Sequence, residues 1–236
     1  MTLPGAPRGI LVVTGTGTGV GKTVVTAAIA ALALARGERV AVVKPAQTGV
    51  GDPNGDVPDA ETVRRLSGVN DTHELARYPD PLSPEAAART AGLPPLDMHA
   101  AAEYVGELAA ARDLVLVEGA GGLLVRYDAA GATIADLAAG LDAPAVVVAA
   151  AGLGTLNHTA LTCEALAARK VARAGVVVGS WPRRPGLAEL TNLADLEVIV
   201  GEPLAGVLPE GAGALDRTAF LAAARAGLSS RLGGER

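Results

Sequence analysis

The sequence contains very few aromatic residues, cysteines and histidines. Of its 236 residues only 2% are aromatic while 50% are hydrophobic, so the core must be built from aliphatic side chains. The single cysteine, Cys163, excludes an internal disulfide framework and a cysteine metal cluster. The three widely spaced histidines argue against a histidine-rich metal site.

Basic charge is also scarce. The formal net charge is −5, and lysine occurs only at positions 22, 44 and 170 among 20 basic residues. Nucleic-acid binders need a basic surface and often stacking rings, so we expect no nucleic-acid partner. Because arginine supplies most of the cations in this chain, a lysine is itself a hint of a specific role.

Long hydrophobic runs and a targeting segment are absent as well. Residues 1–14 carry one cation and a single apolar run of four residues, which is too short for a signal peptide. The longest stretch without a formal charge, residues 143–163, is interrupted by Pro144, Gly152 and Gly154. It is therefore no membrane span. We expect no membrane partner and a cytoplasmic setting.

Apolar runs alternate with helix-like segments along the chain. Strands are expected at residues 9–14, 39–44, 113–117, 143–149 and 174–178, with candidate short edge strands at 197–200 and 205–208. Helices are expected at residues 22–36, 59–66, 83–90, 97–111, 155–168 and 218–232. The strands lack polar alternation, which is typical of parallel strands buried on both faces. The expected fold is α/β, a doubly wound, mostly parallel sheet with helices on both faces, in one domain over residues 1–236.

A glycine-rich loop, GTGTGVGKT at residues 15–23, lies between the first expected strand and the first expected helix. Its glycines let main-chain N–H groups wrap a phosphate, and the helix N-terminus adds a partial positive charge. Lys22 is expected to reach the β- and γ-phosphates and the Thr23 hydroxyl to bind Mg²⁺. The loop has one residue more than the general phosphate-loop spacing. Its position between a strand and a helix still predicts the P-loop NTPase type of fold.

Two charged residues lie where expected strands end, which is where open α/β sheets bind ligands. Lys44 ends the strand at 39–44 and is followed by Pro45. Glu118 follows the strand at 113–117 and precedes a run of small residues that permits a ligand to approach closely. An acid at this position is placed to hold Mg²⁺ directly or through water.

Two further features allow a structural and a functional interpretation. Asp59 begins a short helix and is a preferred capping residue, while Asp52 and Asp56 compete with it as metal ligands. Chemistry alone does not choose among the three. Residues 152–158 lie at the start of an expected helix. They form either a site for an anion such as a carboxylate or an ordinary strand-to-helix turn.

Four motifs in this order and spacing resemble those of dethiobiotin synthetase: GTGTGVGKT, VVKPAQTG, LVEGAGG and LGTLNHT, within a region from about Ile10 to Pro209. The longer spacing of the phosphate loop is the spacing of that family. The resemblance implies formation of a cyclic urea from 7,8-diaminononanoate, CO₂ and ATP, giving dethiobiotin, ADP and phosphate in biotin biosynthesis. It also implies a carbamate and then a carbamic-phosphoric anhydride as intermediates.

The resemblance also assigns roles to residues. It implies that Lys22, Lys44 and Thr48 are catalytic, and it selects Asp59 to bind Mg²⁺ with Thr23 and Glu118. It implies a homodimer in which the second subunit contributes part of the substrate site. The implied substrate-binding residues are Lys44, Thr48, Pro84, Gly154, Thr155, Leu156 and Asn157. The implied nucleotide-binding residues are Gly19, Val20, Gly21, Lys22, Thr23, Val24, Asp59, Glu118, Gly119, Ala120, Gly121, Gly179, Ser180, Leu208, Pro209 and Glu210.

The base-binding segments depart from the family pattern. Gly179 and Ser180 stand where the family often has Asn-Asp, and residues 208–210 match the other base-side segment loosely. Fewer base-edge hydrogen bonds predict weak discrimination among nucleotides. The alternative function is a switch ATPase of the partition or division-site type. Those proteins share the fold but carry a second loop lysine where this chain has Gly17.

Overall fold

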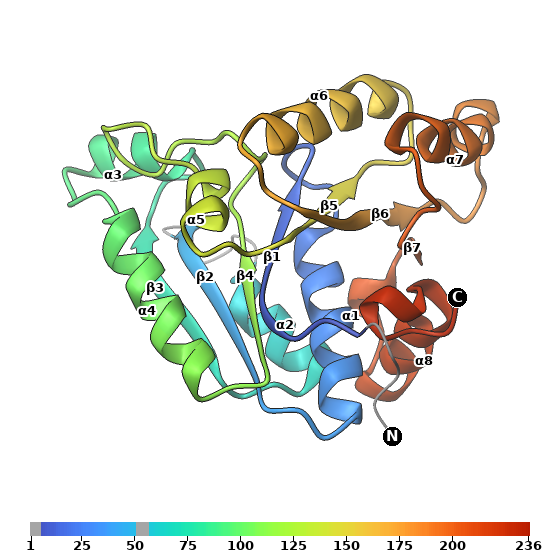
Figure 1. Cartoon of the computed structure of the whole chain (residues 1–236), viewed down its shortest axis with the longest axis horizontal. Coiled ribbons are helices and arrows are strands. Elements are labelled where there is room, and N and C mark those ends of the chain that lie inside the picture. Colours follow the sequence, from blue (N-terminus) through green and yellow to red (C-terminus); the bar gives the residue numbers. More distant parts are fainter. Residues whose placement is uncertain (1–5, 51–56) are drawn as a thin grey trace.

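The computed structural model describes residues 6–50 and 57–236. In these residues seven parallel strands form one sheet in the order β3-β2-β4-β1-β5-β6-β7 (Figure 1). The chain extends the sheet on one side of β1 and then, from β5 onward, on the other side, so the predicted doubly wound α/β fold is confirmed. The strands are β1 (Gly9–Gly15), β2 (Val40–Thr48), β3 (Thr72–Tyr78), β4 (Leu114–Glu118), β5 (Ala145–Ala149), β6 (Arg173–Trp181) and β7 (Gly206–Pro209).

Helices cover both faces of the sheet (Figure 1). One face packs against α1 (Lys22–Ala35), α2 (Asp59–Ser67) and α8 (Arg217–Gly227). The other packs against α3 (Pro84–Ala91), α4 (Met98–Ala110), α5 (Ile134–Gly140), α6 (Thr155–Ala168) and α7 (Leu187–Val200). Leu11 and Val13 face the first core and Val12 faces the second, which explains why the strand sequence is continuously apolar. In the described part of the chain, no helix is long and apolar enough to cross a membrane.

The expected edge strand at residues 197–200 is wrong, because these residues form the last turn of α7. Leu196 and Val200, four positions apart, are both buried, whereas Val198 between them is 80% exposed. That is the period of a helix and not the period of a strand. The other edge-strand candidate corresponds to β7.

The expected end of a strand at Lys44 is also wrong, since β2 continues to Thr48. Residues 40–43 pair with β4, whereas β2 pairs with β3 from Val42 as far as Thr48. Pro45 cannot donate a main-chain hydrogen bond, and it is tolerated here because β2 has already separated from β4. Lys44 lies just past this separation, and its ammonium donates to Glu118, the last residue of β4.

The last expected helix, residues 218–232, is shorter in the structure. Its residues fall into α8 and the 3₁₀ turn η2 (Ser230–Leu232), and another 3₁₀ turn, η1 (Ala212–Ala214), precedes α8. Gly227 ends α8, and Leu228 returns to an extended conformation to form a bridge with Gly206 at the start of β7. This bridge places the residue after α8 against the edge strand β7.

Candidate active site

The phosphate loop connects β1 to α1 at the carboxyl edge of the sheet. Gly21 caps α1 with a φ of 96°, a left-handed conformation that favours glycine. The Lys22 ammonium turns back over the loop and donates to the carbonyl oxygen of Gly17 at 2.8 Å. Burial, followed by the charge of Lys44, lowers the pKa of Lys22 to about 8. The loop therefore presents its only lysine close to the backbone that would enclose a phosphate.

Four polar side chains from four different elements meet beside this loop. Thr23 Oγ1 lies 3.0 Å from Asp59 Oδ1 and 2.7 Å from Glu118 Oε1. Lys44 Nζ lies 2.5 Å from Asp59 Oδ2 and 3.0 Å from Glu118 Oε1. It also donates to the carbonyl oxygen of Gly119 at 3.1 Å. Helices α1 and α2 and strands β2 and β4 thus bring one ammonium, one hydroxyl and two carboxylates together.

Burial and charge set the protonation of this group. Only 2% of Glu118 and 5% of Lys44 are exposed. Burial raises the pKa of Glu118, with Lys44 acting in the opposite direction. Burial disfavours the ammonium of Lys44, but Glu118 and Asp59 together hold the pKa of Lys44 above its ordinary value. Burial also opposes ionisation of Asp59, yet the charge of Lys44 holds the pKa of Asp59 below its ordinary value. Lys44 therefore stays charged beside ionised Asp59.

The oxygen atoms of Thr23, Asp59 and Glu118 fit a Mg²⁺ ion, which prefers oxygen ligands. In the described residues no group of three or more His, Cys, Asp or Glu side chains forms a closed metal cage. A metal ion here would take its remaining oxygens from nucleotide phosphates and water, which is the usual arrangement for Mg²⁺ in nucleotide sites. Asp52 and Asp56, the competing candidates, lie outside the described residues.

Thr48 lies at the same edge of the sheet as Lys44. It is four residues further along β2, about 13 Å away along the strand. Gly49 donates its N–H to the carbonyl oxygen of Asp80 at 3.0 Å, so the segment before α3 lies directly beside Thr48. Pro84, the first residue of α3, follows that segment and is itself buried.

The segment Gly154–Asn157 is not brought to Lys44 within one chain. It begins α6 after β5, and β5 is three strand positions from β2 in the sheet, roughly 14 Å. The Thr155 side chain is buried, and its hydroxyl donates to the carbonyl oxygen of Ala150 at 2.7 Å. The neighbouring Leu153 is 94% exposed. Gly154 and Asn157 are also exposed, whereas Thr155 and Leu156 pack toward the core.

The base-side segments lie next to each other on β6 and β7. A Cβ atom at Gly179 would lie 2.1 Å from the carbonyl oxygen of Val20, so only glycine fits against the phosphate loop there. Ser180 is exposed. Glu210 donates its N–H to the carbonyl oxygen of Trp181 at 2.7 Å. Leu208 has its side chain in the core, so only its main chain is open to a ligand.

The structure adds two residues to the site that sequence patterns did not single out. The side-chain oxygen of Gln47 accepts the N–H of Asp59 at 3.1 Å. The hydroxyl of Tyr127, which is fully buried, accepts the N–H of Ala120 at 2.6 Å. Tyr127 is one of only three tyrosines. The rarity that pointed to a specific role for each lysine could have pointed to Tyr127 as well.

Solved structures share this fold at low sequence identity. The septum site-determining protein MinD from Pyrococcus horikoshii OT3, complexed with Mg-ADP, matches with a TM-score of 0.55 and 18% identity. The match covers 85% of this chain and 81% of that one. A ParA family ATPase from Chlorobium tepidum TLS matches with a TM-score of 0.55 and 13% identity, covering 93% and 90% of the two chains. At these identities the likeness shows the fold alone.

Sequence relatives are much more similar. A family model described as an AAA domain matches residues 9–214. The ATP-dependent dethiobiotin synthetase BioD of Frankia casuarinae is 66% identical over 224 residues, which are 95% of this chain and 93% of that protein. The protein of the same name from Streptomyces avermitilis is 58% identical over 226 residues, 95% and 94% of the two chains. This chain therefore belongs to the family of ATP-dependent dethiobiotin synthetases, the ligases of biotin biosynthesis that consume ATP.

Proposed function

We propose that this chain closes the urea ring of dethiobiotin from 7,8-diaminononanoate, CO₂ and ATP, releasing ADP and phosphate. The observation that carries the proposal is the meeting of Lys44 with Thr23, Asp59 and Glu118 beside the phosphate loop. This arrangement joins a buried cation to a site suited to Mg²⁺ and ATP. We further propose that residues 1–236 act as one domain in the cytoplasm.

The proposed reaction has three steps. One amine attacks the carbon of CO₂, loses a proton and becomes a carbamate. A carbamate oxygen then attacks the γ-phosphorus of ATP, ADP leaves, and a carbamic-phosphoric anhydride forms. The second amine attacks the carbonyl carbon, loses a proton and expels phosphate. The last step benefits from proximity because the attacking amine is tethered to the same molecule.

Two lysines and one hydroxyl carry this chemistry in the proposal. Lys44 offsets the negative charge of the carbamate, and Lys22 stabilises the charge on the phosphoryl group as it transfers. Thr48, further along β2 than Lys44, hydrogen-bonds the substrate or its carbamate. Mg²⁺ held by Thr23, Asp59 and Glu118 would supply positive charge to the phosphate oxygens.

The substrate carboxylate is proposed to bind at the start of α6 in a second subunit. The N–H groups in the first turn of α6 are not used by the helix itself and suit an anion. The distance between this segment and Lys44 in one chain supports contribution from a partner. Exposed apolar side chains near it also support a homodimer, namely Leu153, Leu161 and Leu124. Leu161 and Leu124 line a hollow of about 310 Å³, and Thr16 of the phosphate loop lines the same hollow.

The nucleotide base is proposed to lie against Gly179, Ser180 and residues 208–210. Gly179 offers no side-chain amide, and its close contact with Val20 leaves no room for one. Weak discrimination among nucleotides therefore remains our expectation, and selection of ATP over CTP and GTP in a competition assay would contradict it.

A switch ATPase is not favoured as the alternative. Its support is a fold shared at 13–18% identity, whereas dethiobiotin synthetases are 58–66% identical over nearly the whole chain. Gly17 also occupies the position of the second loop lysine that such ATPases carry.

Oxygen labelling tests the proposed intermediates directly. If a carbamate oxygen attacks phosphorus and the anhydride later breaks at its carbon–oxygen bond, one oxygen of CO₂ ends in phosphate. We expect C¹⁸O₂, supplied in a reaction short enough to limit exchange with water, to give phosphate with one ¹⁸O and a urea carbonyl with the other. Dethiobiotin formed together with unlabelled phosphate would contradict the anhydride.

A further inference from the structure

Gln47 bonds the end of β2 to the start of α2. Its side-chain oxygen accepts the main-chain N–H of Asp59 at 3.1 Å, and its side-chain nitrogen donates to the carbonyl oxygen of Thr48 at 3.1 Å. The residue is only 9% exposed. A primary amide is the side-chain group that offers an acceptor and a donor together at this length, so both bonds depend on glutamine at this position.

The first of these bonds replaces a helix cap. The N-terminal N–H groups of a helix need acceptors from outside the helix. Pro58, at the N-cap position of α2, offers no side-chain acceptor. The oxygen of Gln47 supplies one from another element, as a capping side chain would. Its partner is the N–H of Asp59 itself, whose carboxylate contacts Thr23 and Lys44.

We infer that Gln47 is a positioning residue for the metal site. By holding the main chain of Asp59, it fixes where that carboxylate lies relative to the Thr23 hydroxyl and to Glu118. The inference rests on the proposed role of Asp59 as a Mg²⁺ ligand. Partners that orient a metal ligand commonly change metal affinity by about 10- to 100-fold when they are lost.

Direct metal binding tests this inference without relying on turnover. Free Mn²⁺ is counted by electron paramagnetic resonance in titrations of the full chain with ADP. We expect Gln47→Leu to weaken Mn²⁺ binding by about 10-fold or more. Gln47→Glu keeps an acceptor for the Asp59 N–H but loses the donor to Thr48, and it is expected to lose less Mn²⁺ affinity than Gln47→Leu.

Ser67→Ala is the matched control at the opposite end of the same helix. Ser67 is also buried, and its hydroxyl donates to the carbonyl oxygen of Val63 at 2.7 Å and accepts the N–H of Val69 at 3.1 Å. Its loss loosens α2 without touching Asp59, so Mn²⁺ binding is expected to stay unchanged. Gln47→Met replaces Gln47→Leu if the latter does not fold.

Each outcome has a definite meaning. Weaker binding in Gln47→Leu alone supports the inference. An equal loss in Ser67→Ala or in Gln47→Glu overturns it, because general loosening or a changed side chain would then explain the effect. Asp59→Asn separates the two proposals. If it weakens Mn²⁺ binding and Gln47→Leu does not, only the role of Gln47 fails. If Asp59→Asn binds Mn²⁺ normally, the proposed metal site fails.

Discussion

At the residue scale, Lys44 is the counter-charge for a carboxylate that is almost completely removed from water. Its ammonium lies 3.0 Å from Glu118, which is 2% exposed. Removing one partner of a buried ion pair leaves the other charge uncompensated, whereas removing both costs far less. Stability and catalysis at this site are therefore separable by a pair of substitutions.

We predict that Lys44→Met lowers the free energy of unfolding by about 3 kcal/mol. The double variant Lys44→Met, Glu118→Gln should recover part of that loss, since Asp59 still lacks its partner, and should remain inactive, as measured by urea unfolding and product formation. The exposed Lys170→Met is the control, with an expected change within about 0.5 kcal/mol. Purely additive losses in the double variant would contradict the pairing.

Sequence reasoning at this scale selected residues that lie close together in the structure. Lys22 follows a glycine-rich loop, and Lys44 and Glu118 stand out by residue type, although Lys44 does not end its strand. Gln47 was missed because its bond is to the main chain of a residue twelve positions away. Spacing carries no information about such a bond, since it depends on where α2 begins relative to β2.

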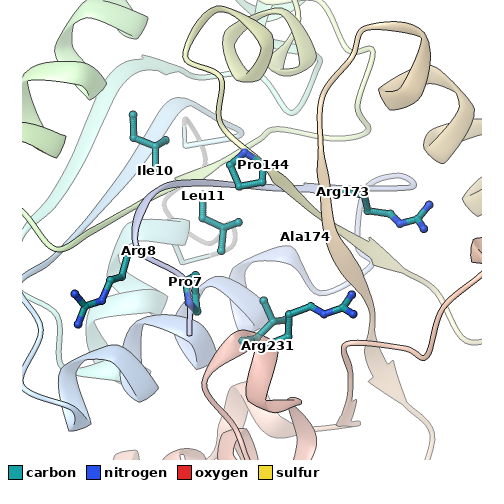
Figure 2. A pocket seen from close by; sticks show the side chains of 9 residues that line it. Pro7, Arg8, Ile10, Leu11, Pro144, Arg173, Ala174 and Arg231 are labelled. Atoms are coloured by element: carbon teal, nitrogen blue, oxygen red, sulfur yellow. The ribbon is translucent and has the colours of Figure 1, made fainter. Parts of the chain in front are cut away.

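At the scale of elements, Glu202 fastens the turn after α7 to β6 and η2. It accepts from Arg173 Nε at 3.0 Å and is also bonded by Arg231. These two arginines line a hollow of about 330 Å³ with Pro144, Leu11 and neighbouring side chains (Figure 2). Burial opposes ionisation of Glu202, but Arg231 and Arg173 hold the pKa of Glu202 below its ordinary value.

A lowered carboxyl pKa in the folded state means that the unfolded chain binds more protons. The stabilisation is therefore present above the ordinary pKa of glutamate, about 4.3, and is lost as the pH falls through the lower folded value. We predict that Glu202→Gln costs about 1 kcal/mol at pH 7 and that the difference shrinks toward pH 3 in urea unfolding. A pH-independent difference would contradict this, and the exposed Glu107→Gln is the control.

Strands and helices were predictable where the pattern of apolar residues is clear or where residues typical of element ends mark their boundaries. Strands β1, β4 and β5 are short apolar runs buried on both faces, and α1 ends just before Gly37. Strand β3, THELARY, was not predicted because it lies at the sheet edge and is mostly half-buried, so it keeps polar residues. Residues 197–200 looked like a strand because β-branched side chains are common there, yet tertiary packing made them helical.

At the scale of the whole molecule, the sheet order separates the two halves of the proposed substrate site. Two β-strands, β4 and β1, lie between β2, which carries Lys44, and β5, which leads into α6. A homodimer resolves this separation if each active site takes its α6 segment from the partner. This separation could not be predicted from the sequence, because it depends on the strand order of the fold, and the shared site was expected only by resemblance.

Mixing two inactive variants tests the shared site. Lys22→Met disables the phosphate loop, and Asn157→Asp places a negative charge where the substrate carboxylate is proposed to bind. In a mixed dimer one site keeps both groups intact, so equal mixing with full subunit exchange should restore about a quarter of the activity at low diamine concentration. No recovery in a mixture shown to contain mixed dimers would place the whole site in one chain.

The most direct test of the central claim is phosphate release from ATP with Mg²⁺, measured with and without diaminononanoate and bicarbonate. We predict release only when both are present, with one molecule of product of the mass of the cyclic urea for each phosphate. Phosphate release at the same rate without the diamine would contradict the proposed reaction. It would also contradict the roles proposed for Lys44, Thr48 and the start of α6.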